Sequence, residues 1–217
     1  MHLVTTAIIC AARPHGEHGA IARLMTEEAG LLAGYVQGGR SRRMRPIMMP
    51  ANIVAATFRA RTEEQLASLT IEMVHSRAPL MREPLAAAAI DWVTTLTGVA
   101  LPEGHAYPAL FAGLSGLLSA IELSPVASNW SGALVRYETL LLAELGYGDV
   151  LERTTDLSKA LARNGKAINK HLLSGPRADN IADVRARLIA RLERGFAPRF
   201  ASSEMVHSPS NRSDGIA

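Results

Sequence analysis

Four of the arginines in this 217-residue chain fall within six consecutive positions. They are Arg40, Arg42, Arg43 and Arg45, with two glycines directly before them and Pro46 directly after. Glycine and proline on either side favour a loop over a helix face. Charges at this density repel one another unless solvent or an anionic partner screens them, and the planar guanidinium matches phosphate oxygens well. We therefore predict a loop that contacts nucleic acid; a solvated turn would account for the same residues.

Three further arginines, Arg13, Arg59 and Arg61, extend this basic patch if the fold brings their connectors together. Taken singly, each is explained by a solvated surface position. Aromatic side chains for stacking on bases are few in this part of the chain, namely Tyr35 and Phe58, and we expect Phe58 in the core. Phosphate contacts should therefore carry most of the affinity, so binding should be largely independent of base sequence and steeply dependent on salt.

The net charge of +3 is too small by itself to indicate a nucleic-acid binder, but it is unevenly distributed. Residues 1–83 hold ten arginines and seven glutamates, whereas the remainder holds thirteen basic and thirteen acidic residues. The excess of positive charge therefore lies in the first part of the chain. Hydrophobic residues make up 48% of the sequence, which permits a sizeable core and excludes global disorder. Aromatic residues make up only 5%, so this core must be mainly aliphatic.

Residues arranged for catalysis are not recognisable, so we predict no enzymatic activity, no cofactor and no bound metal. His15 and His18 flank Gly16 and Glu17 and could chelate a metal, but no third ligand group is visible and a surface turn explains them better. The single cysteine, Cys10, excludes an intramolecular disulfide and a cysteine-based zinc site, and its apolar neighbours indicate a buried, inert thiol. No glycine-rich phosphate loop is present.

A second group of arginines lies near the end of the chain, at Arg187, Arg191 and Arg194. Their spacing places them on one face of a helix, opposite Val184 and Leu188. A solvated helix face explains this pattern, and a secondary contact with DNA or with an acidic peptide is the alternative.

The first eighty residues have the pattern of short strands that would hold the arginine loop. We predict strands at Leu3–Cys10, Ala20–Thr26, Leu31–Gln37, Asn52–Arg59 and Ser68–His75. Five strands in this length suit a Greek-key barrel of the OB type. The alternation of side chains places Leu69, Ile71 and Met73 on one face of the last strand, and Val54, Ala56 and Phe58 on one face of the strand before it.

Beyond Pro79 the sequence becomes rich in alanine and leucine with helical periodicity. We predict helices from Pro84 to about Gly98, over Ala106–Ile121, over Ser128–Leu145, from a cap at Asp156 to Gly165, and from a cap at Asp179 or Asn180 through Ala182–Arg194 to Gly195. The predicted fold is α+β, with an OB-fold barrel in residues 1–80 and an all-α domain in residues 81–197. Residues 198–217 are predicted to be a disordered tail.

The N-terminal apolar stretch ends at Arg13 and is too short for a signal peptide or a membrane span. We therefore expect a cytoplasmic protein without a membrane partner.

Several segments of the sequence resemble one protein family. In chain order, Ala7–Ile9, Arg13–Glu17, Leu24–Gly30, Gly38–Arg43 and Pro50 resemble the N-terminal half of the bacterial RecO recombination-repair proteins. Residues Ala133–Glu138 and Leu141–Gly148 resemble a helix and a turn of the same family. Many members carry a four-cysteine zinc motif after that turn, which is absent here, and the basic segment near the family's C-terminus has no clear counterpart around Pro198–Phe200.

The resemblance implies an N-terminal OB-fold, a helical C-terminal domain and a recombination mediator that is not an enzyme. Such a protein binds single- and double-stranded DNA at the nucleoid and anneals complementary strands. It works with RecR to load RecA onto DNA coated by single-strand-binding protein. The family's helical domain receives the acidic, hydrophobic C-terminal tail of that coating protein, and Tyr107, Leu110 and Arg136 are the residues we expect to contribute.

Two other classes of function fit parts of the sequence. A basic OB-fold protein that binds RNA or the ribosome would have the same charge distribution, and an enzyme that uses His15 and His18 with a metal would explain the histidine pair. Relative affinity for DNA and RNA separates the first class from a DNA mediator, and elemental analysis tests the second.

Overall fold

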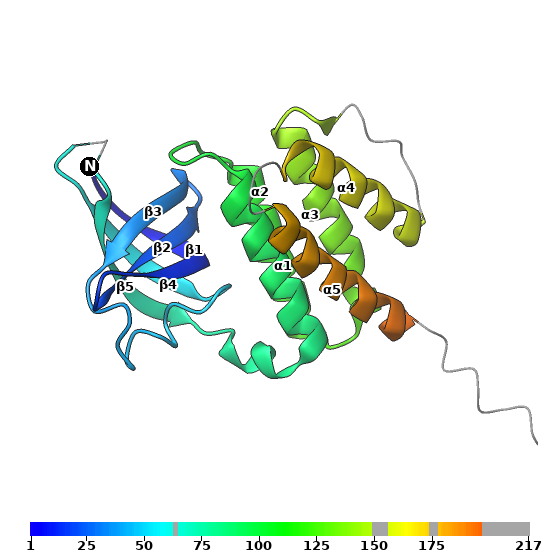
Figure 1. Cartoon of the computed structure of the whole chain (residues 1–217), viewed down its shortest axis with the longest axis horizontal. Coiled ribbons are helices and arrows are strands. Elements are labelled where there is room, and N and C mark those ends of the chain that lie inside the picture. Colours follow the sequence, from blue (N-terminus) through cyan, green and yellow to red (C-terminus); the bar gives the residue numbers. More distant parts are fainter. Residues whose placement is uncertain (63–64, 149–155, 174–177, 197–217) are drawn as a thin grey trace, which may run out of the picture.

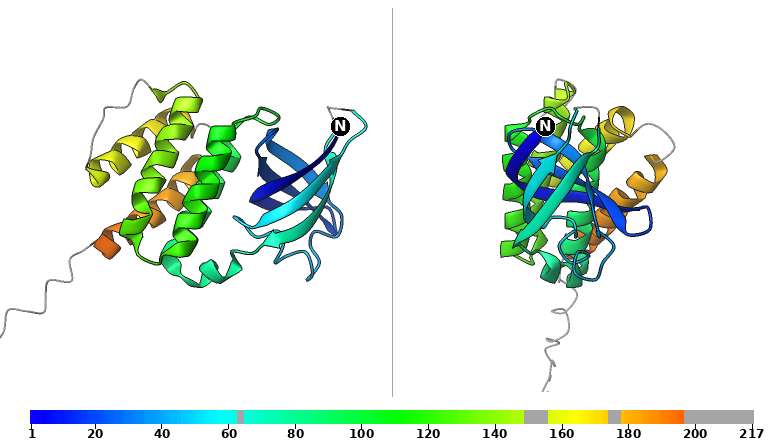
Figure 2. Two further views of the ribbon diagram at one scale, coloured as in Figure 1. Left: turned by 180° about the vertical axis from the view of Figure 1, so that it is seen from behind. Right: turned by 90° about the vertical axis from the view of Figure 1, so that its left-hand side faces the viewer.

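A computed structural model of the chain describes residues 1–62, 65–148, 156–173 and 178–196. Five strands gather at one end of the molecule and the helices at the other (Figure 1). The views from behind and from the side show that the chain passes between the two parts once, through a short 3-10 helix, η1 (Ala78–Arg82) (Figure 2). The predicted α+β fold, with an OB-type barrel followed by a helical part, is confirmed.

The strands close into a barrel in the order β1-β2-β3-β5-β4. Their bounds are β1 His2–His15, β2 Gly19–Thr26, β3 Gly30–Val36, β4 Ile53–Arg59 and β5 Ala67–His75. Strands β3 and β5 pair in parallel, through Gly34 with Ala67 and Tyr35 with Ser68, whereas the other neighbouring strands of the barrel are antiparallel. All five strands lie where the alternation of side chains predicts them, because every strand has one face in the barrel interior.

Strand β1 is longer than predicted, since it continues beyond Cys10 to His15. Its first half pairs with β4 and its second half with β2, and the register with β2 shifts between Ile9 and Ala11. Such a bulge bends a strand and lets it turn from one neighbour to the other. Pro14 is tolerated in the extension because β1 has only β2 beside it there, and prolines are accepted at strand edges.

The interior of the barrel is filled by small and aliphatic side chains, as the scarcity of aromatics requires. Val54, Ala56 and Phe58 are fully buried on one face of β4, as predicted. Leu69, Ile71 and Met73 of β5 pair with Phe58, Ala56 and Val54 of β4, so they share one face, as predicted. Leu69 and Ile71 are buried, whereas Met73, near the end of the strand, is 36% exposed.

The helical part consists of α1 Pro84–Ala100, α2 Pro108–Leu123, η2 Ala127–Asn129, α3 Ser131–Glu144, α4 Leu157–His171 and α5 Ala178–Phe196. Prolines open α1 and α2, where a missing N–H has no cost. Gly146 follows α3 with a φ of 87°, as expected for a glycine that ends a helix. The Asp156 carboxylate accepts hydrogen bonds from the N–H groups of Ser158 and Lys159, and these bonds lower its pKa.

Two predicted helix ends are wrong. Helix α4 does not stop at Gly165 but continues to His171. A Cβ at position 165 would collide with the guanidinium of Arg185, so this glycine provides room for a neighbouring helix and is not a stop signal. Helix α5 begins at Ala178, so Asp179 and Asn180 lie in its first turn and do not precede it, and it continues one residue past Gly195. Acidic residues in a first turn are favoured by the helix dipole, which makes them an ambiguous start signal.

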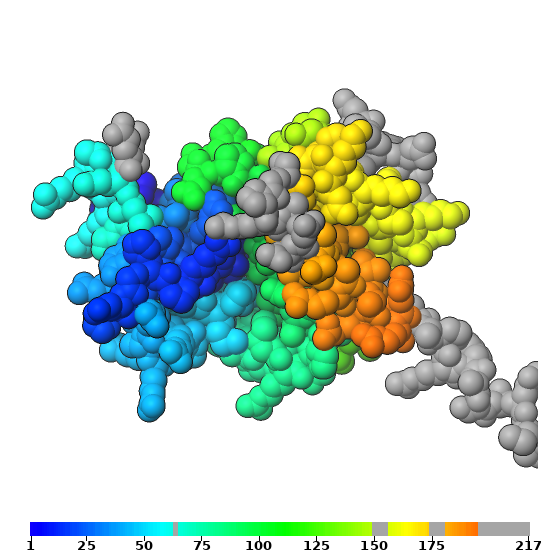
Figure 3. Space-filling model, viewed as in Figure 1, coloured from blue at the N-terminus to red at the C-terminus, as the bar shows by residue number. Residues whose placement is uncertain are grey.

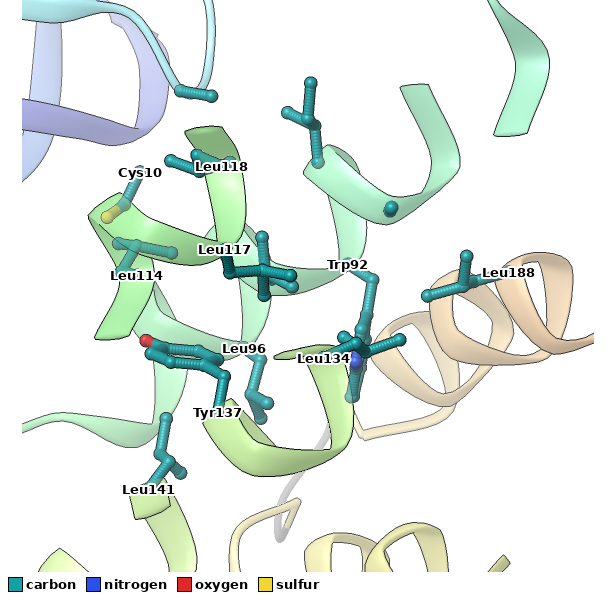
Figure 4. Close-up of a cluster of buried hydrophobic side chains, with 14 of the residues drawn as sticks. Cys10, Trp92, Leu96, Leu114, Leu117, Leu118, Leu134, Tyr137, Leu141 and Leu188 are labelled. Atoms are coloured by element: carbon teal, nitrogen blue, oxygen red, sulfur yellow. The ribbon is translucent and has the colours of Figure 1, made fainter. Parts of the chain in front are cut away.

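Leucines and two tryptophans form the core of the helical part (Figure 4). Of the stripe predicted on α3, Leu134, Tyr137 and Leu141 are at most 2% exposed, and burial raises the pKa of the Tyr137 hydroxyl. The same cluster includes Cys10 of β1, beside the helices in Figure 4, and Met25 of β2. Helices therefore cover one stretch of the outer face of the barrel, while the barrel interior forms a second, separate core.

A buried ion pair ties four helices together. Glu138 of α3 is fully buried, and its carboxylate accepts hydrogen bonds from the Trp92 indole of α1 at 2.8 Å and from Arg185 of α5 at 3.2 Å. Arg185 also donates to the carbonyl of Leu161 in α4 at 2.7 Å, and its guanidinium lies 5.6 Å from the centre of the Trp92 ring. Both carboxylate oxygens of Glu138 accept hydrogen bonds from Arg185, and such compensation is the condition under which a buried pair is tolerated.

Replacing Arg185 by Ala should lower the free energy of unfolding by about 3–5 kcal/mol, because the buried Glu138 carboxylate then has no compensating charge. Arg187→Ala on the same helix is the matched control, since that side chain is 60% exposed and should matter by less than about 1 kcal/mol. Urea unfolding of both variants measures the difference. Equal stabilities would show that the ion pair contributes nothing to holding the helices together.

Candidate nucleic-acid interface

The loop predicted to carry the arginines is a series of tight turns between β3 and β4. We call residues 37–52 the arginine loop. Its apolar side chains, Met44, Ile47 and Met48, lie at three- and four-residue spacing and pack against the barrel core. The four arginines of the loop are exposed. In Figure 1 the loop hangs below the strands. The loop is therefore amphipathic: one side closes the barrel and the other presents guanidinium groups to solvent.

Arg40 fixes the first part of the loop to the hairpin between β1 and β2. Its guanidinium donates to the carbonyls of Gly16 and Glu17 at 3.2 and 3.0 Å, and its backbone N–H donates to the carbonyl of His18. Arg45 in turn donates to the carbonyl of Arg40. The space-filling view shows the surfaces of the hairpin and the loop side by side (Figure 3). Arg40 and Arg45 thus shape the loop as well as contributing charge.

Asn52 and Arg77 fix the other end of the loop. The Asn52 amide donates to the carbonyls of Pro46 and Ile47, and its oxygen accepts the N–H of Arg77 at 2.8 Å. Arg77 is 2% exposed, and it donates to the carbonyl of Ala51 at 2.8 Å and to Glu122 of α2 at 3.0 Å. Loop, linker and helical part therefore meet at one polar cluster. We did not anticipate either residue from the sequence, because neither carries a local motif.

Arg42 and Arg43 are exposed. Neither side chain makes a hydrogen bond or ion pair with any residue that the structure describes, and the same is true of the Arg13 side chain. Arg13 lies beside the loop, because a cleft of about 270 Å³ is lined by Arg13, Arg40 and Arg45 together with small and apolar residues of the hairpin and the loop. The structure thus brings Arg13 together with the loop, as the sequence prediction required.

Arg59 and Arg61 lie elsewhere on the barrel. The arginine loop leads into the start of β4, whereas Arg59 is the last residue of that seven-residue strand and Arg61 follows it. Six steps along a strand separate the two ends by about 20 Å. Both arginines are exposed, but they do not belong to the arginine loop cluster. Their predicted contribution therefore depends on whether a bound strand follows the barrel surface from one end to the other.

The described residues show no arrangement for catalysis. Burial raises the pKa of the Cys10 thiol to about 12, which disfavours the thiolate that a nucleophile needs at neutral pH. No cluster of three or more His, Cys, Asp or Glu side chains occurs among them. His18 is 86% exposed in the hairpin turn beside Glu17, and His15 stands against the ring of Tyr35.

A groove of about 360 Å³ runs between α2 and α3, and Arg136 stands exposed at its rim. Its walls include Gly113, Gly116 and Ala133, whose small side chains leave room, with Leu117 in the floor. The other two residues predicted to contact a partner are placed differently. Leu110 is fully buried in the core, and Tyr107 is 9% exposed and packs edge-on against His105. Of the three, only Arg136 lines this groove.

Of the three arginines predicted on one face of α5, Arg187 and Arg194 are exposed, whereas Arg191 is half-buried. Arg187 lies 3.5 Å from Asp91 of α1, and Arg194 donates to the carbonyl of Ala190 in its own helix. Arg187 and Arg191 line a groove of about 440 Å³ together with Pro50, the residue near the end of the arginine loop. Val184 does not lie opposite them, because it lines the same groove as Arg187 and Arg191.

Among the described residues, none of the helices combines the length and the apolar character that a membrane crossing needs.

A closed five-stranded barrel in this strand order, followed by a helical bundle, defines a protein of the OB-fold class. Residues 1–77 match the family model described as "Recombination protein O N terminal", and residues 81–211 match "Recombination protein O C terminal". The chain belongs to the RecO family.

Curated relatives with the name "DNA repair protein RecO" support this assignment. The protein of Granulibacter bethesdensis is 34% identical over 205 residues, which cover 91% of this chain and 81% of the relative. That of Gluconacetobacter diazotrophicus is 38% identical over 74% of this chain and 62% of the relative. That of Rhodospirillum centenum is 42% identical over 68% of this chain and 58% of the relative. The chain therefore spans about 60% of the length of the last two relatives.

Replacing Arg40 by Ala should speed amide hydrogen exchange in residues 38–45 by on the order of fivefold, because the loop loses its hydrogen bonds to the hairpin. Arg42→Ala removes the same charge without an anchoring contact and should leave the exchange rates unchanged. Hydrogen exchange followed by mass spectrometry measures both variants. If both variants exchange alike, Arg40 does not hold the loop.

Proposed function

We propose that this protein is a DNA repair and recombination mediator that binds single- and double-stranded DNA through the arginine loop and anneals complementary strands. The observation that carries the proposal is the exposed arginine loop, in which the guanidinium groups of Arg42 and Arg43 have no partner among the described residues. Arg13 adds to it, because it lines a cleft together with Arg40 and Arg45 of the loop. Membership of the RecO family supports it, since the curated relatives carry the name of a DNA repair protein.

Annealing follows from phosphate contacts alone. Two complementary strands repel each other through their phosphates, and arginines that neutralise phosphates on both strands reduce this repulsion. Contacts to the backbone fix the position of a strand but leave its base edges free to pair. A loop that offers guanidinium groups at the surface, with its apolar side buried, supplies this kind of contact. The reaction needs no covalent chemistry and therefore no nucleophile, base or metal.

In this proposal the protein acts with RecR to load RecA onto DNA that is coated by single-strand-binding protein. The groove beside Arg136 is the proposed docking site for the acidic, hydrophobic C-terminal tail of the coating protein. An apolar floor with an exposed guanidinium at its rim suits a peptide that ends in apolar side chains and a carboxylate.

The double variant Arg42→Ala/Arg43→Ala should weaken binding to oligonucleotides of any sequence, because it removes phosphate contacts without disturbing the loop anchors. The dependence of log K on log salt should become less steep by about 0.7 for each lost contact to a single strand. Fluorescence anisotropy with single- and double-stranded DNA, and with RNA of equal length, measures both quantities.

The matched control is Arg82→Ala/Arg194→Ala, which removes the same charge from exposed positions outside the loop. An unchanged affinity and salt slope in the loop variant would reject the arginine loop as the DNA site. Stronger binding to RNA than to DNA by the unmodified protein would favour a role in RNA binding. Failure to anneal complementary strands coated by single-strand-binding protein would count against the mediator function.

Replacing Arg136 by Glu should weaken binding of a synthetic acidic tail peptide at least about tenfold, because the peptide carboxylate then meets a like charge in place of a guanidinium. Arg194→Glu makes the same change in charge at an exposed position on α5 and should leave the affinity within about twofold. Isothermal titration with the purified variants measures both. Equal affinities for the peptide would place the docking site elsewhere.

A further inference from the structure

The outer face of the barrel carries a row of residues that the register of the strands aligns from β1 around to β4. Pairing joins Arg13 to Ile21, Ile21 to Tyr35, Tyr35 to Ser68 and Ser68 to Arg59. The residues on either side of this row in β2, β3 and β5 point inward and are buried, so all members of the row face outward. One aromatic ring therefore stands midway between two exposed arginines.

Only one stretch of this outer face is covered by the helices. Ile8 of β1, Met25 of β2 and Leu31 of β3 face outward and pack into the helical core. Further along, Arg23 spans the border, because it donates to the Gly98 carbonyl of α1 and pairs with Glu103 at 2.9 Å. Beyond Arg23 the face is open, and the row with Tyr35 lies there. OB folds bind oligonucleotides on the β2–β3 face, between the loops that follow β1 and β4.

The ring of Tyr35 is held in a defined place. It lies against the backbone of Gly19 on the neighbouring strand, where even a single Cβ would collide with the ring and its hydroxyl. The imidazole of His15 stands edge-on to it, with ring centres 6.0 Å apart and planes at 80°. Tyr35 remains partly exposed in spite of both contacts. Because its contacts with Gly19 and His15 already restrict the Tyr35 ring, the ring loses little conformational freedom when a base stacks on it.

We propose that Tyr35 is a stacking platform for one unpaired DNA base, with the adjoining phosphates held by Arg13 and Arg59. Neighbouring strands lie about 4.8 Å apart, so each arginine starts about 10 Å from Tyr35 and can reach toward it along a strand bound across the barrel. Bases in a duplex are stacked on both faces and cannot engage the ring, so this subsite recognises single strands. The inference rests on the proposed DNA binding and adds to it a stacking position on the barrel face, which Arg13 connects to the arginine loop.

Three variants test the platform. Tyr35→Leu keeps an apolar side chain but removes the π face, and Tyr35→Trp keeps a ring that can stack. Gly19→Ala keeps the tyrosine in the sequence but displaces its ring, because the added Cβ would occupy the space of the ring. Val4→Ala is the control, because it shortens an exposed side chain of the same barrel on the part of β1 that pairs with β4. Thermal melting confirms that each variant is folded.

The probes are a single-stranded oligonucleotide of about 16 nucleotides, near the upper end of the site size for one OB fold, the same length with abasic sites, and a duplex. Tyr35→Leu and Gly19→Ala should each lower the affinity for the ordinary single strand between about fivefold and 100-fold. The affinities for the abasic strand and the duplex should stay within about twofold. Val4→Ala should change none of the three.

Tyr35→Trp gives a direct reading of stacking. The native tryptophans, Trp92 and Trp130, are at most 1% exposed and should not respond to DNA, so any quenching comes from position 35. We expect quenching by the ordinary single strand and none by the abasic strand. If the unmodified protein binds no DNA, the proposed function itself fails. If it binds DNA but Tyr35→Leu binds single strands equally well, or Tyr35→Trp is not quenched, only the platform is overturned.

Discussion

The burial of Arg77 is the interaction on which the rest of the arrangement depends. A guanidinium that is 2% exposed must have its donors satisfied, and here they are satisfied by a carbonyl of the arginine loop and by Glu122 of α2. The N–H of the same residue holds Asn52, which in turn holds the loop backbone. One side chain therefore fixes the end of the loop, the start of the linker and the position of a helix relative to the barrel.

This junction explains how a loop with four arginines keeps a definite shape. Mutual repulsion alone would spread the charges, but the loop is tied to the hairpin by Arg40 at one end and to the linker by Asn52 at the other. Methionine and isoleucine side chains between the arginines close the barrel beneath it. Two arginines, Arg42 and Arg43, stay free of internal contacts among the described residues. The charges that shape the loop and those that remain available to a partner are therefore different ones.

Much of the fold could be predicted from the sequence. Each strand or helix buries one face, and the spacing of its apolar residues indicates which face that is. The five strands and the start of α1 follow from the pattern of apolar residues and a helix-opening proline, whereas α2 begins at Pro108, two residues after its predicted start. The helix end predicted at Gly165 is wrong for a reason that the local sequence does not contain. Gly165 has the type of a stop residue, yet it sits inside α4 to make room for Arg185, a neighbour that is remote in the chain.

The candidate site divides in the same way. The sequence by itself determined the arginine loop, since charge density and flanking glycine and proline are local properties, and it determined the family pattern that spans both parts. The tertiary structure alone decided that Arg13 joins the loop while Arg59 does not, that Leu110 is buried while Arg136 is exposed, and that Tyr35 stands in line with Arg13 and Arg59. These relations arise from pairing between strands and packing between helices, which no short stretch of residues encodes.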